Sequence, residues 1–157
     1  MRIMDIKFDS VADGEGVRSV VFTAGCPHFC RGCHNPKSWN INNGEEMDIN
    51  EIVERLEYAG HKKVTISGGD PFFQSNALSG LVKELRERDY DIWVYTGYTF
   101  DELKNMGSQD VDSILASINA LVDGRFVESL KCPLIQYRGS SNQKILHLKD
   151  GLICKTS

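Results

Sequence analysis

The sequence lacks any long apolar run. No stretch approaches the ~20 apolar residues that a membrane-spanning helix needs, and residues 1–6 are too short and too charged for the apolar region of a signal peptide. We therefore expect a cytoplasmic protein with no membrane partner. An excess of positive charge is also absent, since 18 lysine and arginine residues stand against 22 aspartate and glutamate residues. This balance disfavours a nucleic-acid partner and favours a small-molecule or protein substrate.

The chain also has no internal repeat, no low-complexity segment and no linker. Its 157 residues fall within the range typical of one domain, and a hydrophobic content of 41% is ordinary for a globular protein. A chain of this length can bury a proper core without disulfide or metal staples. We therefore predict a single domain over residues 1–157.

Cysteine is scarce, and its spacing is the most informative feature of the chain. Of five cysteines, Cys26, Cys30 and Cys33 follow the pattern C-x3-C-x2-C, whereas Cys132 and Cys154 lie outside any spaced motif. An odd number of cysteines in a reducing compartment favours metal binding or catalysis over a disulfide framework. No second knuckle supplies a fourth ligand, although structural zinc sites and ordinary iron–sulfur clusters have four protein ligands. Three thiols therefore predict a metal centre with one position open for a substrate.

Apolar periodicity predicts alternating strands and helices. Runs typical of strands lie at residues 2–8, 17–24, 63–67, 92–95 and 118–122. Helical spacing is found at residues 48–56, 75–89, 100–106 and 111–117. This order predicts an α/β fold whose strands from residue 17 onward are parallel and joined by right-handed crossovers. After residue 130 the rhythm fades, and only a short apolar run at 145–148 remains.

Four of the predicted strands each end in a loop with chemically useful residues. The first of these loops holds the three cysteines, and the others hold Gly68-Gly69-Asp70-Pro71, Thr96-Gly97 and Asp123-Gly124-Arg125. Ligands in α/β folds bind at the carboxyl ends of parallel strands, which share one edge of the sheet. We therefore expect all four loops to meet around one site.

These motifs resemble those of the radical S-adenosylmethionine (SAM) superfamily, in which a C-x3-C-x2-C loop follows one strand and a Gly-Gly-Asp-Pro-like turn follows the next. Within it, residues 13–18 (DGEGVR) and 34–39 (HNPKSW) are similar to the glycyl-radical-enzyme activases. Residues 122–126 (VDGRF) and 138–143 (RGSSNQ) are similar to the activases that act on anaerobic ribonucleotide reductase. The resemblance runs from about residue 10 to residue 150, which is nearly the whole chain.

The resemblance implies a partial (βα) barrel of the radical SAM type, with the site on loops at the carboxyl ends of parallel strands. It implies a [4Fe–4S] cluster bound by Cys26, Cys30 and Cys33, with SAM on the fourth iron. The remaining implied SAM contacts are the methionine-binding turn Gly68, Gly69, Asp70 and Pro71, then Thr96 near the ribose or carboxylate, and the pair Asp123 and Arg125.

The resemblance also implies the reaction and the partners. SAM would be cleaved reductively, and the resulting 5′-deoxyadenosyl radical would take a hydrogen atom from a glycine in the large subunit of anaerobic ribonucleotide reductase. An electron donor such as flavodoxin is implied as a second partner. No catalytic side chain is implied, because the abstracting species is a carbon radical.

Simpler interpretations stay open for each motif. The three cysteines also suit a zinc knuckle completed by His28 or His34, in a binding module or an electron carrier. Gly-Asp-Pro is common turn chemistry, Thr96-Gly97 suits a loop cap, and Asp123 with Arg125 suits a surface ion pair. Other small radical SAM enzymes, of the pyruvate formate-lyase activase or 7-carboxy-7-deazaguanine synthase type, are alternatives within the superfamily.

The chain departs from the superfamily at Gly32, where an aromatic residue often precedes the third cysteine and packs on adenine. Phe29 and His34 are the candidates to replace it. Trp39 and Trp93 are interpreted as packing residues. Residues 138–143 are interpreted as a lid, a partner-docking loop or a solvated turn.

Overall fold

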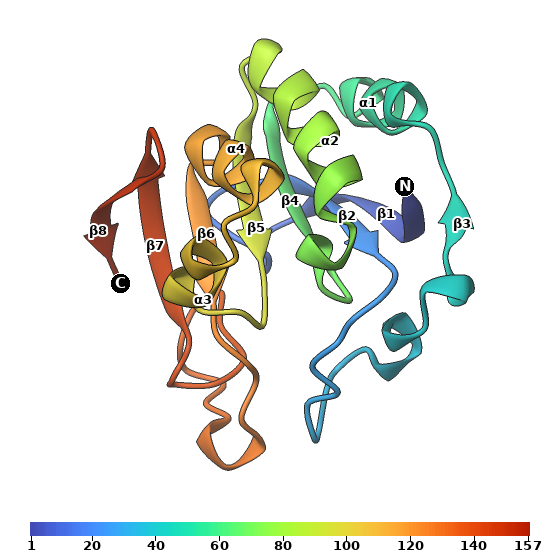
Figure 1. The fold of residues 1–157 in the computed structure, drawn as a ribbon. Coiled ribbons are helices and arrows are strands. Elements are labelled where there is room, and N and C mark those ends of the chain that lie inside the picture. The colour runs from blue at the N-terminus through green and yellow to red at the C-terminus, as the bar shows by residue number, and fades with distance from the viewer.

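The structure is a computed structural model that describes residues 1–157. It has a mixed α/β fold built on one eight-stranded sheet in the order β3-β1-β2-β4-β5-β6-β7-β8 (Figure 1). The strands are β1 (Arg2–Ser10), β2 (Arg18–Thr23), β3 (Glu45–Glu46), β4 (Lys63–Gly68), β5 (Asp91–Tyr95), β6 (Ala120–Asp123), β7 (Lys144–Lys149) and β8 (Leu152–Thr156). The helices are α1 (Ile49–Tyr58), α2 (Ser75–Glu87), α3 (Phe100–Asn105) and α4 (Gln109–Ser117). None of these helices has both the length and the apolar character that crossing a membrane requires.

The centre of the sheet is parallel, as the alternation of strands and helices predicted. Strands β2, β4, β5 and β6 pair side by side in parallel, with helices in each connection. Their registers include Val20 opposite Thr65 and Val64 opposite Ile92. The carboxyl ends of the four strands therefore lie at one edge of the sheet, where their loops begin.

The flanks of the sheet are antiparallel. Strand β1 pairs with β2 in the opposite direction, and β7 and β8 form a hairpin that adds antiparallel strands next to β6. The apolar run at 145–148 lies within β7, whereas the periodicity of the sequence does not indicate β8. The turn of the hairpin contains Asp150 and Gly151, both with positive φ, which is the backbone geometry that matches the twist of a two-stranded hairpin.

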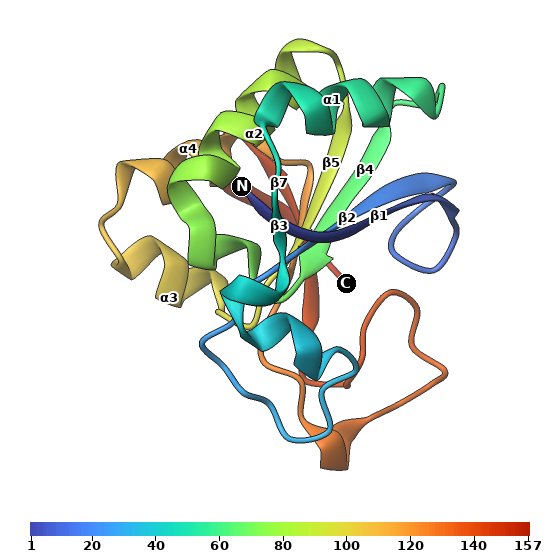
Figure 2. The same cartoon turned by 90° about the vertical axis from the view of Figure 1, so that its right-hand side faces the viewer.

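All four helices pack on one face of the sheet (Figures 1 and 2). They form the main core with alternate strand residues, for example Ile66 in β4 and Val94 in β5, both fully buried. The helix caps follow the local sequence, since Asp48 accepts from the Asn50 amide and Thr99 forms a capping box with Glu102.

The apolar cluster on the other face of the sheet is smaller, and loops cover that face. Trp93, Ala120, Val122 and Ile145 form a separate cluster there, with Tyr137 packed edge-to-face on Trp93. Arg18 lies fully buried on this face at 5.1 Å from the Trp93 ring. Its guanidinium donates to the Thr65 hydroxyl and pairs with Asp91 at 2.7 Å. This arrangement leaves the carboxyl edge of the sheet open for the site.

Candidate metal centre

The cysteine loop is anchored at its base by backbone hydrogen bonds. The amide of Gly25 donates to the Ser38 carbonyl at 2.7 Å, and the amide of Cys26 donates to the Trp39 carbonyl at 3.1 Å. The Asp70 amide donates to the Gly25 carbonyl at 2.8 Å, which joins the loop after β4 to the same base. The loop that begins after β2 is therefore closed on itself and tied to its neighbour.

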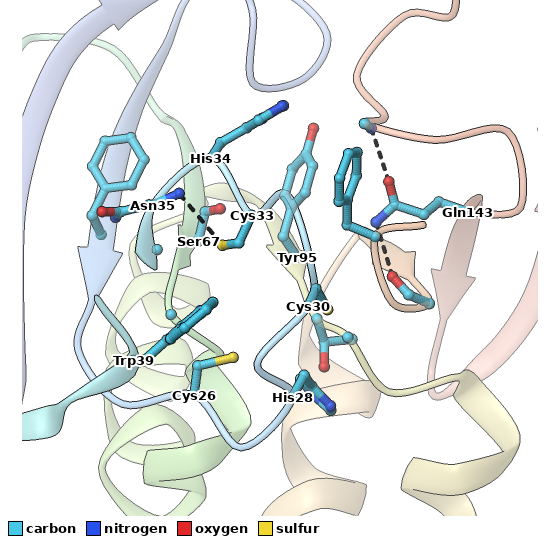
Figure 3. A pocket seen from close by; sticks show the side chains of 18 of the residues that line it. Cys26, His28, Cys30, Cys33, His34, Asn35, Trp39, Ser67, Tyr95 and Gln143 are labelled. Atoms are coloured by element: carbon cyan, nitrogen blue, oxygen red, sulfur yellow. Dashed lines mark hydrogen bonds between the residues drawn. The ribbon is translucent and has the colours of Figure 1, made fainter. Parts of the chain in front are cut away.

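The four predicted loops meet around one cavity of about 320 Å³. Figure 3 shows the cysteines around it, with Trp39 on one wall and Gln143 on the opposite one. The lining residues come from all four loops, from the ends of the strands before them, from the turn between β1 and β2, and from the segment before β7: Asp13, Phe22, Cys26, His28, Cys30, Cys33, His34, Asn35, Trp39, Ser67, Gly68, Gly69, Tyr95, Thr96, Gly97, Gly124, Phe126, Gly139 and Gln143. The expectation that these loops converge is confirmed.

The donor set in the cavity suits a soft metal cluster. Cys26, Cys30 and Cys33 are half-buried free thiols, and all three face the same cavity. Burial raises the pKa of the Cys26 thiol and the charge of Asp70 adds to this, whereas hydrogen bonds from the backbone at residues 28 and 29 oppose it. All three cysteines come from one loop and line this single cavity. Cysteine thiolates are the ligands that hold iron–sulfur clusters.

Two glycines at the end of β4, Gly68 and Gly69, let the neighbouring loop approach closely. A Cβ atom on Gly68 would lie 2.4 Å from the Thr23 nitrogen, and one on Gly69 would lie 2.3 Å from the Gly25 oxygen. Gly68 also has a φ of +108°, which disfavours other residues. Both glycines line the cavity, so their backbone groups are accessible to a ligand.

The side chain of Asp70 points away from the cavity lining and into the protein. It is fully buried and accepts hydrogen bonds from the Thr96 hydroxyl, the Gly97 amide at 2.9 Å and the Phe72 amide at 3.0 Å. His28 completes this set, with Nε2 at 2.7 Å from the carboxylate. Pro71 is buried at the start of the short helix that Asp70 caps. The carboxylate therefore joins three of the four loops.

The other predicted SAM contacts are divided between two places. Thr96 lines the cavity, although its hydroxyl is engaged by Asp70. Asp123 and Arg125 line an adjacent cavity of about 470 Å³ and do not line the one that holds the cysteines. Asp123 accepts from the Phe100 amide at 2.9 Å, and burial raises the pKa of its carboxyl. Arg125 is exposed and lies 3.7 Å from Glu102.

Aromatic side chains also line the cavity. Of the two candidates for adenine packing, His34 lines the cavity and contacts Phe126 at a ring distance of 5.3 Å, whereas Phe29 is exposed and packs on Trp39. Trp39, interpreted from sequence as a packing residue, also lines the cavity. Gly32, where the superfamily often has an aromatic residue, has a φ of +76°.

The segment at 138–143 closes one side of the cavity. Gln143 accepts from the amides of Gly139 and Ser140 and donates to the Gly124 carbonyl at 2.8 Å. Gly139 and Gln143 both line the cavity. The segment is therefore a wall of the site, held to the loop after β6.

Three thiols on one loop, at the carboxyl edge of the parallel strands, are the ligand set that an iron–sulfur protein of the α/β class would use. In agreement, residues 12–146 match the family model described as a 4Fe-4S single cluster domain. The match covers most of the chain, and it supports the [4Fe–4S] cluster over a zinc knuckle.

Relatives that match nearly the full length of the chain show which family of iron–sulfur proteins it belongs to. The chain is 40% identical over 151 residues to the anaerobic ribonucleoside-triphosphate reductase-activating protein of Escherichia coli K12, which covers 88% of this chain and 94% of the relative. The proteins of that name from Salmonella typhimurium LT2 and Enterobacteria phage T4 are 39% and 33% identical, over 88% and 89% of this chain and 94% and 90% of theirs. The chain belongs to the family of anaerobic ribonucleoside-triphosphate reductase-activating proteins, which confirms the resemblance read from its motifs.

Proposed function

We propose that this chain activates the large subunit of an anaerobic ribonucleotide reductase. The reaction is the reductive cleavage of SAM, and the 5′-deoxyadenosyl radical that forms abstracts hydrogen from a glycine of the partner to leave a glycyl radical. The observation that carries this proposal is the cavity in which three free thiols face two glycine-bearing turns, in a chain of this family. When bound, a [4Fe–4S] cluster supplies the electron that cleaves SAM.

The residues of this chain would bind, orient and enclose the reactants. Cys26, Cys30 and Cys33 would hold the cluster, which would supply an open position for SAM. Gly68 and Gly69 present backbone groups to the methionine end, and Asp70 and Pro71 hold that turn in place. His34 lies where an aromatic ring can pack on adenine.

Three further residues take supporting roles in the proposal. Thr96 keeps the turn after β5 facing the cavity through its bond to Asp70. Asp123 caps the start of α3, and Arg125 contacts the ring of His28 at 3.3 Å, so both act beside the SAM site and outside its lining. An electron donor such as flavodoxin would reduce the cluster.

The same proposal includes the finer description of the fold. Residues 1–157 form a single domain, and the parallel strands β2, β4, β5 and β6 form part of a (βα) barrel of the radical SAM type. The support is the loop-covered second face of the sheet, which carries few apolar residues and borders the cavity.

An anaerobic reconstitution tests the function. The protein is loaded with iron and sulfide, reduced and mixed with SAM, and 5′-deoxyadenosine is measured together with the electron paramagnetic resonance spectrum. We expect a reduced [4Fe–4S] signal that changes on adding SAM, and a glycyl radical when the reductase is present. Pyruvate formate-lyase and the 7-deazaguanine precursor serve as alternative substrates. Turnover of either in place of the reductase would refute the partner assignment.

Cysteine variants identify the cluster ligands in the same assay. Alanine at Cys26, Cys30 or Cys33 is expected to abolish iron binding and SAM cleavage. Cys154→Ala is the matched control, because Cys154 is exposed on β8, away from the cavity. A colourless protein that holds zinc and leaves SAM intact would contradict the proposal.

A further inference from the structure

His28, in the middle of the cysteine loop, contacts each of the three neighbouring loops. Its Nε2 lies 2.7 Å from Asp70 Oδ2, and its Nδ1 lies 3.3 Å from Arg125 Nε. Its ring packs edge-to-face on Tyr98 at 4.4 Å, and only 4% of the side chain is exposed. A Cβ at Gly97 would lie 2.3 Å from the imidazole, so the absence of a side chain there makes room for His28.

The partners of His28 determine its tautomer. A guanidinium has only donors, so the Nδ1 atom that faces Arg125 Nε must accept. The ring hydrogen is therefore on Nε2, which donates it to the Asp70 carboxylate. This carboxylate is buried and takes its other hydrogen bonds from the loops after β4 and β5. Such a pair, with a buried carboxylate orienting an imidazole, is rigid because every polar group in it is satisfied.

The backbone next to His28 needs such an anchor. Phe29, the following residue, has a φ of 49°, which is unfavourable for a side chain of that size. Phe29 is 62% exposed, and its ring packs edge-to-face on Trp39 at 5.3 Å without being enclosed, so burial of this residue contributes little to holding the conformation. The contacts of His28 oppose relaxation of the segment between Cys26 and Cys30.

We propose that His28, as the Nε2–H tautomer, is a positioning residue that fixes the cysteine loop in its cluster-binding conformation by its hydrogen bond to Asp70. This inference rests on the membership of the chain in a [4Fe–4S] family, and it is independent of the reaction with SAM. Its tests use neither SAM nor a partner. Absence of SAM cleavage with the results below intact would refute the proposed function alone.

The first test reads the tautomer directly. The chain has four histidines, so ¹⁵N-histidine labelling of the full-length protein before cluster loading gives few signals, and the signal lost in His28→Gln assigns this residue. We expect the long-range ¹H–¹⁵N pattern of a ring that carries its hydrogen on Nε2, the nitrogen that faces Asp70. A ring protonated at Nδ1, or a signal that reports rapid exchange between tautomers, would overturn the proposal.

The second test measures how fast the reconstituted protein loses iron to a chelator. His28→Phe keeps a ring but removes the donor, and we expect iron loss roughly tenfold faster than in wild type, the effect of one hydrogen bond to a charged group. His28→Gln places an amide N–H near the position of Nε2, and we expect a rate close to wild type. His61→Gln is the matched control, because His61 does not line the cavity. Equal rates for wild type and His28→Phe, or for His28→Gln and His28→Phe, would refute the role of the donor.

A double-mutant cycle connects the effect to Asp70. Asp70→Asn offers the His28 ring a weaker, uncharged partner, so in this background the difference between Phe and Gln at position 28 should largely disappear. A difference of undiminished size would show that His28 acts without Asp70 and would contradict the proposal. Should His28→Phe fail to fold, the tautomer measurement on the wild-type protein decides the question.

Discussion

A single methyl group added at Gly69 should push the loop after β4 away from the base of the cysteine loop. In Gly69→Ala the new Cβ would lie 2.3 Å from the Gly25 oxygen and 3.0 Å from the Ser38 oxygen. Both are backbone atoms at the base of the cysteine loop, so neither can move aside as a flexible side chain can. The φ of Gly69 does not lie in the left-handed region, so the contact alone makes alanine unfavourable.

The size of the effect follows from the required displacement. An ordinary contact begins at 3.4 Å, so the two loops must separate by about 1.1 Å. The hydrogen bonds from the Gly69 amide to Thr23 and from the Asp70 amide to Gly25 are both 2.8 Å long, and they would be lost at that separation. Two hydrogen bonds of about 1 kcal/mol each, with some overpacking strain, predict a destabilisation of about 2–4 kcal/mol.

Urea unfolding and iron content after reconstitution measure the two consequences. We expect Gly69→Ala to unfold at lower urea and to bind little iron. Gly80→Ala is the control, because its Cβ would meet only the end of the Ile49 side chain and alanine favours the helix around it. Wild-type stability together with full iron content in Gly69→Ala would refute the argument that close backbone approach fixes this loop.

Two further predictions concern the fold around the site. Arg18→Met should lower the free energy of unfolding by about 3 kcal/mol, because it removes a buried guanidinium from its hydrogen-bonded partners, whereas Arg55→Met, which breaks an exposed pair with Glu51, should cost less than about 0.5 kcal/mol in the same urea experiment. Equal effects would contradict this. Burial raises the pKa of Asp123, so its carboxyl stabilises the folded chain below the unfolded pKa and this contribution is lost as the pH rises through the folded pKa. Asp123→Asn should therefore lose less stability than wild type as the pH rises above about 4, and a parallel pH profile would refute this.

The parallel centre of the fold could be predicted because its local signals agree. The strands β2, β4 and β5 are short β-branched or aromatic runs, and the helices between them have a continuous apolar stripe. The β7–β8 hairpin was not predicted because β8 is exposed along its whole length and has no buried alternation. It forms by pairing with β7, which is a tertiary effect that periodicity does not report.

The convergence of the loops and the placement of the three cysteines at one cavity were also within reach of the sequence, since strand order alone places the loop ends at one edge. The role of the Asp70 side chain could not be predicted from the sequence. Its partners His28 and Thr96 are 42 and 26 residues away, so no local pattern shows that the carboxylate is hydrogen-bonded to groups of the protein itself. Asp123 and Arg125, which the resemblance implied as SAM contacts, line the cavity adjacent to the one with the cysteines, and no local pattern in the sequence shows this placement.

The cysteine loop should lose iron before the sheet unfolds. Its residues contribute little to the main apolar core, and it is held by backbone bonds at its base and by the pair of His28 and Asp70 in its middle. Directional bonds of this kind are lost by displacements of about 1 Å, whereas the core under the four helices tolerates them. In a urea titration under chelator, we expect iron release at a lower urea concentration than the loss of helical circular dichroism. Coincident transitions would show that the loop and the core unfold as one cooperative unit, and would contradict the view that these few polar contacts alone hold the site.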